Sequence, residues 1–417
     1  MTGLDQRKNT TIAWFADNGF GKLKGVGAND VRVSFETAFA EISEEEAKSE
    51  FDSYRDDVVA YIDGDRKDLK GKYFLLGESA KYHPNCKRLF ESDSYKSDMF
   101  LLFAIFSANE VHDFQTETVN LWLAGSVPDA SVTGKRLAEK TKGWHKARIG
   151  NKIHIFRAIV AGVINEGSKV GGQGEFITID FGRRTALPTH WRNGRSITPA
   201  ITNEGVQKFL DHFQYAIRQK MCGMVEIDVI EAALMRWEKV KTDVPLKGEE
   251  LEKAKAEGKS TTREAMVYPP LMIKDMNVDR EYTETLALWL EKSLKQALIL
   301  KSKQSTEVPI YAIGGGTHLP KIRPMLKKFG VIVNHSDPVF ANALSGFQYF
   351  FHGKEAPMKT FSEITAPKTK SKSSSSPKPK QATEKEVDEI TDESEAPDQA
   401  TDQSTESTID VAGEDAA

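Results

Sequence analysis

Aspartate and glycine occur together at the ends of two strand-like segments. Residues 11–16 are short and mostly apolar, and they lead into the turn Asp17-Asn18-Gly19-Phe20-Gly21-Lys22-Leu23-Lys24. Residues 176–179 repeat the arrangement and lead into Asp180-Phe181-Gly182. A carboxylate at a strand end can hold a magnesium ion through its water shell, and glycine lets backbone N–H groups approach a phosphate closely. The two segments indicate a site for a phosphate-bearing ligand.

The first of these turns is followed by another strand rather than by a helix. Residues 24–27 read Lys-Gly-Val-Gly, and residues 31–35 alternate as a strand. This pattern predicts a hairpin, whereas a Rossmann or Walker loop opens a helix. The sequence contains no G-x-x-x-x-G-K-S/T motif. Lys24 can bring a cation to phosphate oxygens, although an ordinary glycine hairpin explains this turn equally well when it is taken alone.

Two later segments have small residues where a ligand or a helix could approach. The apolar residues 310–313 are followed by Gly314-Gly315-Gly316-Thr317, where a flat base or a phosphate could lie against the backbone. Residues 340–346 read Phe-Ala-Asn-Ala-Leu-Ser-Gly and predict a helix that packs closely across a hinge.

The elements that must position these turns alternate along the chain between segments with the helical period and segments with the strand period of apolar residues. Patterning predicts helices at residues 95–109, 207–221, 227–240 and 282–300. It predicts strands at residues 11–16, 31–35, 120–124, 152–163, 175–180 and 308–313. Such alternation is typical of the α/β class, in which ligands bind at the strand ends.

Length and composition indicate a soluble protein with two core-bearing domains. The chain has 417 residues, of which 39% are hydrophobic and 28% charged. Its longest apolar stretch, residues 99–108, is about half of the roughly 20 residues that a membrane span needs. Residues 1–10 are polar, unlike a signal peptide. Only two cysteines occur, so we expect a reducing, cytoplasmic location.

Two segments are expected to lie outside the core. Residues 358–417 form a tail rich in Ser, Thr and Pro that should be disordered. Its five lysines between positions 368 and 380 could tether DNA or an adaptor protein, or the tail could act only as a solubilising brush. The rest of the chain is near neutral, so direct DNA binding is not indicated by charge. Residues 241–270 predict a flexible insertion, for which a charged loop is favoured over a short exposed helix.

Together, the order and spacing of these segments resemble the actin superfamily. The turn of residues 17–24 resembles the first phosphate loop of actin. Residues 95–108, 121–134 and the closing D-P-V-F-A-N-A-L-S-G-F look more like the bacterial plasmid-segregation actins of the ParM/StbA type. The resemblance covers residues 11–351. It implies two duplicated α/β domains around a nucleotide cleft, at residues 11–182, completed by about 336–353, and at residues 183–335.

The resemblance also implies roles for individual residues. Asp17 and Asp180 would hold Mg²⁺ from opposite sides of the cleft, and both belong to the expected catalytic set. Gly19, Gly21 and Lys24 would cradle the β- and γ-phosphates of ATP. The residues expected to complete the nucleotide site are Asn18, Phe20, Gly182, Gly314, Gly315, Gly316 and Thr317.

The attacking water is positioned in this superfamily by a Glu or Gln that follows the preceding strand. That strand ends here in Val163-Ile164-Asn165-Glu166-Gly167. Glu166 is therefore the candidate, with Asn165 as the alternative in register. A carboxylate at this place could orient water and accept its proton late in the reaction.

The second phosphate loop departs from the family pattern. Arg183 and Arg184 follow Gly182, where the family has another glycine or small residue. They could clamp the triphosphate, but solvent exposure or pairing between domains is favoured, because these loops rely on backbone amides. Arg218 and Lys220, on the predicted helix 207–221, are candidates for contacts with the purine.

The function implied is an ATP-hydrolysing bacterial actin that polymerises into filaments, for plasmid or DNA segregation through a DNA-bound adaptor. One alternative is a scaffold that binds nucleotide without turnover. Another is a soluble ATPase or kinase of the same superfamily. No sugar-binding signature supports a kinase, and no ordered substrate-binding domain is expected after the ATPase to support a chaperone.

Overall fold

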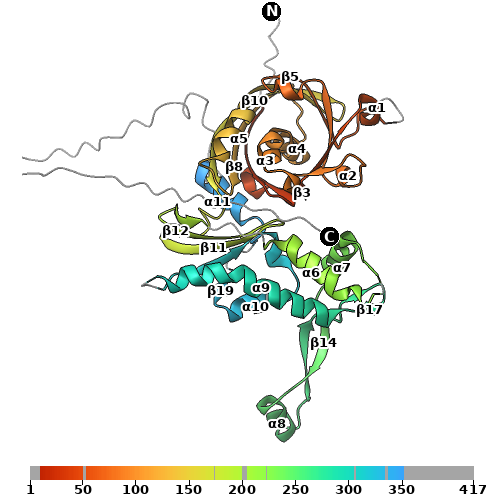
Figure 1. The fold of residues 1–417 in the computed structure, drawn as a ribbon, viewed down its shortest axis with the longest axis vertical. Coiled ribbons are helices and arrows are strands. Elements are labelled where there is room, and N and C mark those ends of the chain that lie inside the picture. The colour runs from red at the N-terminus through yellow and green to blue at the C-terminus, as the bar shows by residue number, and fades with distance from the viewer. Residues whose placement is uncertain are drawn as a thin grey trace, which may run out of the picture. The chain divides into compact units, whose positions relative to one another are not determined.

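The computed structural model describes residues 10–49, 53–172, 174–199, 204–221, 223–304, 307–333 and 337–351. The predicted tail, residues 358–417, lies outside the described residues, and so does Cys222. Two main sheets form, one of ten strands and one of five, with helices packed against both (Figure 1). The α/β class expected from the sequence is confirmed.

The ten-stranded sheet, called here the first sheet, contains the strands before residue 166. Its spatial order is β3-β2-β1-β8-β10-β9-β5-β6-β4-β7. β1 and β10 both run parallel to β8, whereas β1 and β2 form the antiparallel hairpin that the sequence predicts. The bounds are β1 Thr10–Asn18, β2 Lys22–Gly27, β3 Arg32–Glu36, β4 Ala38–Ile42, β5 Val58–Gly64, β6 Lys72–Leu76, β7 Lys87–Arg88, β8 Thr118–Val127, β9 Gly143–Ile149 and β10 Lys152–Asn165.

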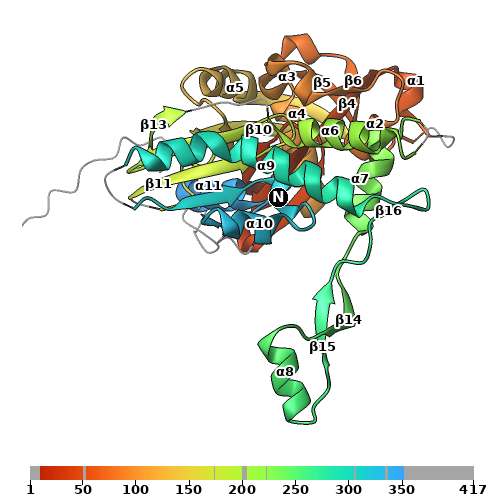
Figure 2. The ribbon, with the colours of Figure 1, turned by 60° about the horizontal axis from the view of Figure 1, so that its bottom comes forward.

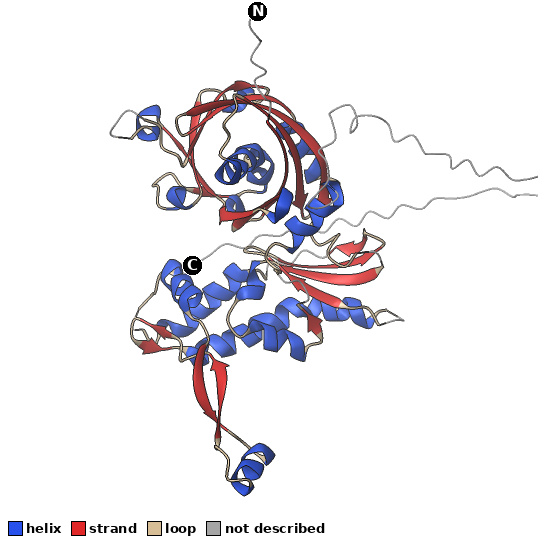
Figure 3. Ribbon diagram, turned by 180° about the vertical axis from the view of Figure 1, so that it is seen from behind, coloured by secondary structure: helices blue, strands red, loops and turns tan. Residues whose placement is uncertain are grey.

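The first sheet curls around an apolar helix, α4 (Phe100–His112) (Figures 1 and 3). Every residue from Phe100 to Ala108 is buried, and a helix that is apolar on all sides belongs in a core. The single helix expected at residues 95–109 is two helices, because a short polar helix, α3 (Asp93–Asp98), ends at Met99. α3 faces the cavity and α5 (Thr133–Thr141), whereas α4 fills the centre of the sheet.

The five-stranded sheet, called here the second sheet, has the order β13-β12-β11-β18-β19. Its largest helix, α9 (Asp279–Ser302), packs on β11 and β12 beside α6 (Val206–Arg218) (Figure 2). The strands are β11 Glu175–Phe181, β12 Ala186–Arg192, β13 Arg195–Pro199, β18 Ile310–Ile313 and β19 Val331–Ile332, and α10 (Ile322–Lys328) flanks β19.

The two sheets divide earlier in the chain than the domain boundary expected after residue 182. β11 pairs with β12 and runs parallel to β18, so the strand that carries Asp180 belongs to the second sheet. The chain leaves the first sheet at Asn165, the last residue of β10. The division of the chain into two domains stays a prediction.

The segment between α6 and α9 differs from its sequence-based prediction. The helix expected at residues 227–240 is α7 (Ile227–Arg236), which ends because Trp237 leaves helical geometry (φ −81°, ψ 88°) to pack in the core of the second sheet. The charged loop favoured for residues 241–270 is wrong. β14 (Val240–Pro245) pairs with β15 (Thr262–Val267), and the exposed helix α8 (Glu249–Ala256) lies between them (Figure 2).

The last helix, α11 (Ala341–Phe351), packs on the first sheet through small residues. A Cβ added to Gly346 would overlap the ring of Phe15 in β1, so this glycine permits the close approach expected from the sequence. The remaining elements are α1 Glu44–Ala47, α2 Glu78–Lys81, β16 Met272–Ile273 and β17 Met276–Asn277. Among the described residues, none of the helices combines the length and apolarity of a membrane span.

Candidate functional site

A cavity of about 490 Å³ brings together residues of the two sheets. Ten of the thirteen residues singled out from the sequence line it: Asp17, Gly19, Phe20, Gly21, Lys24, Glu166, Asp180, Gly182, Gly315 and Gly316. They come from the β1–β2 turn, the end of β10, the end of β11 and the turn after β18. Segments that are far apart in the sequence therefore meet at one place.

The β1–β2 turn places an acid and a cation side by side. Asp17 and Lys24 are partners in the antiparallel register, with Lys24 Nζ 3.4 Å from Asp17 Oδ2. Asp17 Oδ1 accepts a hydrogen bond from the Ser126 hydroxyl at 2.8 Å. A Cβ on Gly19 would lie 2.7 Å from the Lys22 carbonyl oxygen. Gly19 therefore allows the turn to close with Lys24 directed into the cavity.

Lys24 remains charged in spite of its burial. Burial alone would lower the pKa of this ammonium group. The carboxylates of Asp17, Asp180 and Glu166 outweigh that effect, so its pKa is raised. An ammonium held by surrounding acids can be offered to a more strongly charged phosphate.

Asp180, at the end of β11, faces the same centre. Burial, followed by the nearby charge of Glu166, raises the pKa of its carboxyl group to about 7. The side-chain amide of Asn342 donates to Asp180 Oδ2 at 2.6 Å. Gly314 has φ 87°, and a Cβ there would overlap Asp180 Oδ1. Glycine at position 314 is thus required both by its backbone conformation and by the position of Asp180.

Glu166 lies directly after β10 and lines the cavity. Its side chain is 10% exposed, and its Oε1 is 3.0 Å from the ammonium group of Lys96. Asn165, the alternative in register, instead uses its Oδ1 to accept the Ala130 N–H at 2.6 Å. The geometry favours Glu166 over Asn165 as the polar group that faces a ligand.

Three of the singled-out residues do not line the cavity but stabilise its turns. Asn18 is buried, and its Nδ2 donates to the Lys96 carbonyl oxygen at 3.1 Å. The Thr317 hydroxyl donates to the carbonyl oxygen of Gly314 at 2.7 Å, which closes the turn after β18. Asn18, Gly314 and Thr317 do not line the cavity, and their expected contacts with a nucleotide stay a prediction.

The two arginines after Gly182 have different partners. Arg183 lines the cavity, packs against Gly21 and pairs with Glu231 of α7. Its side chain is only 14% exposed, so solvent exposure is wrong for this residue. Arg184 lies over the ring of Phe20, 5.4 Å from its centroid. This second contact joins the β1–β2 turn to the turn after β11.

An apolar part of the cavity adjoins the turn after β18. Val206 and Leu210 of α6 line it, together with Leu319 and Pro320. A flat apolar ring system could be accommodated by this surface. Arg218 and Lys220, the candidates for purine contacts, do not line the cavity. Lys220 instead pairs with Glu281 at 3.0 Å, because both positions lie beyond the turn of α6 that reaches the cavity.

Two residues of the site were missed by the sequence analysis. Lys96 of α3 lines the cavity beside Glu166. Asn342 of α11 is 6% exposed; it donates to Asp180, and its Oδ1 accepts the Gly167 N–H at 2.7 Å. The signals available in the sequence were a lysine next to a long apolar run and one amide in a helix of small residues.

Magnesium and a nucleoside triphosphate fit these residues. The cavity has the size of small-molecule pockets, about 300–1,000 Å³. Within the described part of the chain, no group of three or more His, Cys, Asp or Glu could hold a metal ion on its own. Asp17 and Asp180 would therefore share a magnesium ion with phosphate oxygens and water, as this ion prefers. Without a metal ion, the three carboxylates outnumber the two lysine ammonium groups at the cavity, and this excess negative charge would repel a triphosphate.

Comparisons with known proteins give matches only at the level of structure. No family model matches the sequence, and no curated protein matches it. Ta0583, an archaeal actin homologue, is similar with a TM-score of 0.57 and 16% identity, over 81% of this chain and 98% of its own. ParM of Bacillus thuringiensis with ADP has a TM-score of 0.55 and 16% identity, and the match covers 82% of this chain and 99% of ParM. The same protein with ATP has a TM-score of 0.57 and 15% identity, and the match covers 82% of this chain and 98% of ParM.

Proposed function

We propose that this chain, which has the actin-like fold, binds ATP with Mg²⁺ in the cavity and hydrolyses it as part of a filament cycle. The observation that carries the proposal is the convergence of Asp17, Lys24, Glu166 and Asp180 on one cavity between glycine turns. These residues come from three separate segments, the β1–β2 turn, the end of β10 and the end of β11, and no single segment would indicate such a site. The proposal includes assembly with further copies of the chain and a cytoplasmic location.

The phosphates would be held by the β1–β2 turn and the turn after β18. Lys24 supplies a cation to the β- and γ-phosphates, and Gly19 and Gly21 let backbone amides approach them. Gly315 and Gly316 would lie against the adenosine and α-phosphate. Asp17 and Asp180 would hold Mg²⁺ through water. When bound, the ion would neutralise phosphate charge and bridge phosphate oxygens.

Glu166 would position the attacking water. Its carboxylate lines the same cavity as Asp17 and Asp180, and its charge contributes to the raised pKa values of both Asp180 and Lys24. It can accept a hydrogen bond from water and take up the proton late in the reaction. Lys96 contacts only Oε1 of this carboxylate, so Oε2 can accept from water.

Filament formation is proposed from the fold. The solved structures similar to this chain include proteins named as an archaeal actin homologue and as ParM, the latter with ADP and with ATP. A nucleotide that joins two sheets provides a switch, because loss of the γ-phosphate removes contacts between them. We propose plasmid or DNA segregation as the use of such filaments, with a DNA-bound adaptor as the partner.

The test measures three quantities on the purified full chain after addition of Mg²⁺ and ATP. They are released phosphate, light scattering and the pelleted fraction. We expect all three to rise, and Asp180→Ala to lower phosphate release by at least about a hundredfold because it removes a Mg²⁺ anchor. Asp243→Ala, at an exposed position of β14, is the matched control and should behave as wild type.

Each alternative function has its own outcome in this assay. Nucleotide binding without phosphate release would favour a non-hydrolysing scaffold. Phosphate release without scattering or pelleting would favour a soluble ATPase or a kinase. Normal turnover in the Asp180→Ala variant would contradict the assignment of the site.

A further inference from the structure

Lys96 is a buried cation that the roles assigned above leave unused. Its side chain is 4% exposed, and its ammonium group contacts Glu166 at 3.0 Å. The same nitrogen lies 4.3 Å from the centroid of the Phe20 ring. Burial of an ammonium group costs several kcal/mol unless it is well paired. A lysine in such a place therefore needs an explanation beyond solubility.

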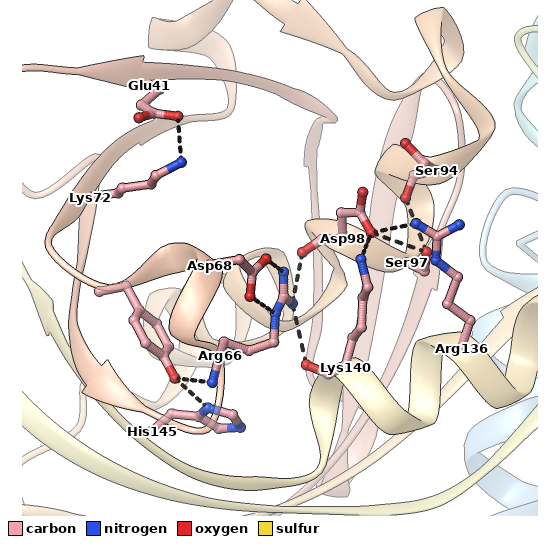
Figure 4. A network of polar contacts seen from close by, with 11 residues as sticks. Glu41, Arg66, Asp68, Lys72, Ser94, Ser97, Asp98, Arg136, Lys140 and His145 are labelled. Carbon is pink, nitrogen blue, oxygen red and sulfur yellow. Dashed lines mark hydrogen bonds and ion pairs between the residues drawn. The ribbon is translucent and has the colours of Figure 1, made fainter.

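The helix that carries Lys96 is held by two sets of contacts in its C-terminal half. Next to the cavity, Asn18 binds the Lys96 carbonyl oxygen. Two residues further on, Asp98 pairs with Lys140 and with Arg136 of α5, and its carbonyl oxygen accepts from Arg66 at 3.0 Å (Figure 4). These contacts fix α3 against the first sheet and against α5. Lys96 is thus pre-positioned at the cavity wall, as binding residues require.

The ammonium group of Lys96 has hydrogen-bonding capacity left for a ligand. A lysine has three N–H donors, and the described hydrogen bonds of Nζ go to Glu166 alone. Lys24, by comparison, is directed at Asp17 on the opposite wall of the turn. The two lysines approach the cavity from different elements, α3 and β2. They can therefore bind different oxygens of one polyphosphate.

We propose that Lys96 binds the terminal phosphate of the nucleoside triphosphate, so that the site distinguishes a triphosphate from a diphosphate. The proposal rests on the proposed function and adds a specificity-determining residue to it. Glu166 is adjacent to the place where the attacking water must lie, so a cation paired with Glu166 is adjacent to the terminal phosphate. Transfer of Lys96 from Glu166 to phosphate also frees the carboxylate to bind water.

The competing explanation is a purely structural ion pair. In that case Lys96 only compensates the charge of Glu166, and its loss should weaken the binding of all nucleotides alike or destabilise the fold. The ratio of triphosphate to diphosphate affinity separates the two explanations, because a structural pair would leave this ratio unchanged.

The experiment measures equilibrium binding of fluorescent ADP and of a fluorescent, non-hydrolysable ATP analogue, both with Mg²⁺, below the concentration at which the protein scatters light. The variants are Lys96→Met and the double variant Lys96→Met/Glu166→Gln, which removes both charges of the pair and keeps side-chain size. Lys72→Met is the control, because Lys72 pairs with Glu41 on the surface. Thermal unfolding reports whether each variant is folded.

We expect Lys96→Met to weaken the ATP analogue by about ten- to a hundredfold, the loss of one charge-assisted hydrogen bond, and to change ADP affinity by less than about threefold. The double variant should keep the fold and show the same loss of preference for the analogue. An unchanged ratio in a folded double variant would overturn the proposal for Lys96 alone. Wild-type protein that binds neither nucleotide would overturn the proposed function as well.

Discussion

Asn342 joins three parts of the molecule through one side chain. It stands on α11, which packs on the first sheet. Its amide donates to Asp180 at the end of β11, and its Oδ1 accepts from Gly167 N–H in the segment after β10. Asn342→Ala removes both hydrogen bonds and adds no new group. We expect this variant to lower stability and to weaken the coupling between α11 and the site.

The size of the expected stability loss follows from the two hydrogen bonds of the Asn342 side chain. A hydrogen bond to a charged group contributes about 1.5–3 kcal/mol, and a neutral one about 0.5–1.5 kcal/mol. The Asn342 side chain is almost completely buried, so water cannot replace either partner. Asn342→Ala should therefore reduce the free energy of unfolding by about 2–4 kcal/mol. Asn120→Ala is the control, because the bond of Asn120 to Thr11 Oγ1 is long, 3.4 Å.

The assay is urea unfolding followed by far-UV circular dichroism and tryptophan fluorescence. A double-mutant cycle of Asn342→Ala with Asp180→Ala isolates the contact between the two side chains, for which we expect a coupling energy of about 1–3 kcal/mol. A loss no larger than that of Asn120→Ala, with additive effects in the cycle, would refute the assignment of Asn342 as the residue that joins α11 to Asp180.

Two further variants test the packing and the electrostatics of the first sheet. Gly346→Leu should destabilise the protein by about 1–3 kcal/mol through overpacking against Phe15. Ser345→Ala is the control and should change the midpoint of urea unfolding little. Equal unfolding midpoints for the two variants would contradict this packing. Burial lowers the pKa of His145, whose ring binds the Tyr61 hydroxyl and the Thr141 carbonyl oxygen. Below about pH 6.5 the unfolded chain therefore protonates this histidine while the folded protein keeps it neutral. As the pH falls through this range, the free energy of unfolding should fall by up to about 1.4 kcal/mol per pH unit. In His145→Gln this slope, measured by urea unfolding between pH 7 and pH 5, should become shallower; an unchanged slope would count against a neutral buried imidazole.

Local patterns were sufficient to predict the parts of the site that lie within one turn. Asp17 and Asp180 each follow a short apolar strand, and the structure places both at the cavity. Lys96 and Asn342 could not be assigned in this way, because their partners are far away in sequence. Lys96 meets Glu166 only after α3 has packed against α5 in the folded protein. Pairings of this kind are set by tertiary structure and leave no local periodicity.

The elements that were predicted wrongly also have tertiary causes. Residues 240–267 have almost no buried apolar face, so neither the hairpin nor α8 was indicated by amphipathicity. The helix that begins at residue 227 ends earlier than predicted because Trp237 packs in the core of the second sheet. There its indole N–H donates to the Pro269 carbonyl oxygen at 2.7 Å. For Arg183, solvent exposure or pairing between domains was favoured. Its partner, Glu231 of α7, lies 48 residues further along the chain, so no local pattern indicates this pairing.

The curled first sheet has a consequence for the way the chain is made. α4 lies between β7 and β8 in sequence, but β1 pairs with β8, and β5 pairs with β9. The sheet cannot close until about residue 165 has left the ribosome. Until then nine consecutive residues, Phe100 to Ala108, that are buried in the finished protein lack their cover. During synthesis these residues therefore form exposed apolar surface, which makes the unfinished chain prone to aggregation.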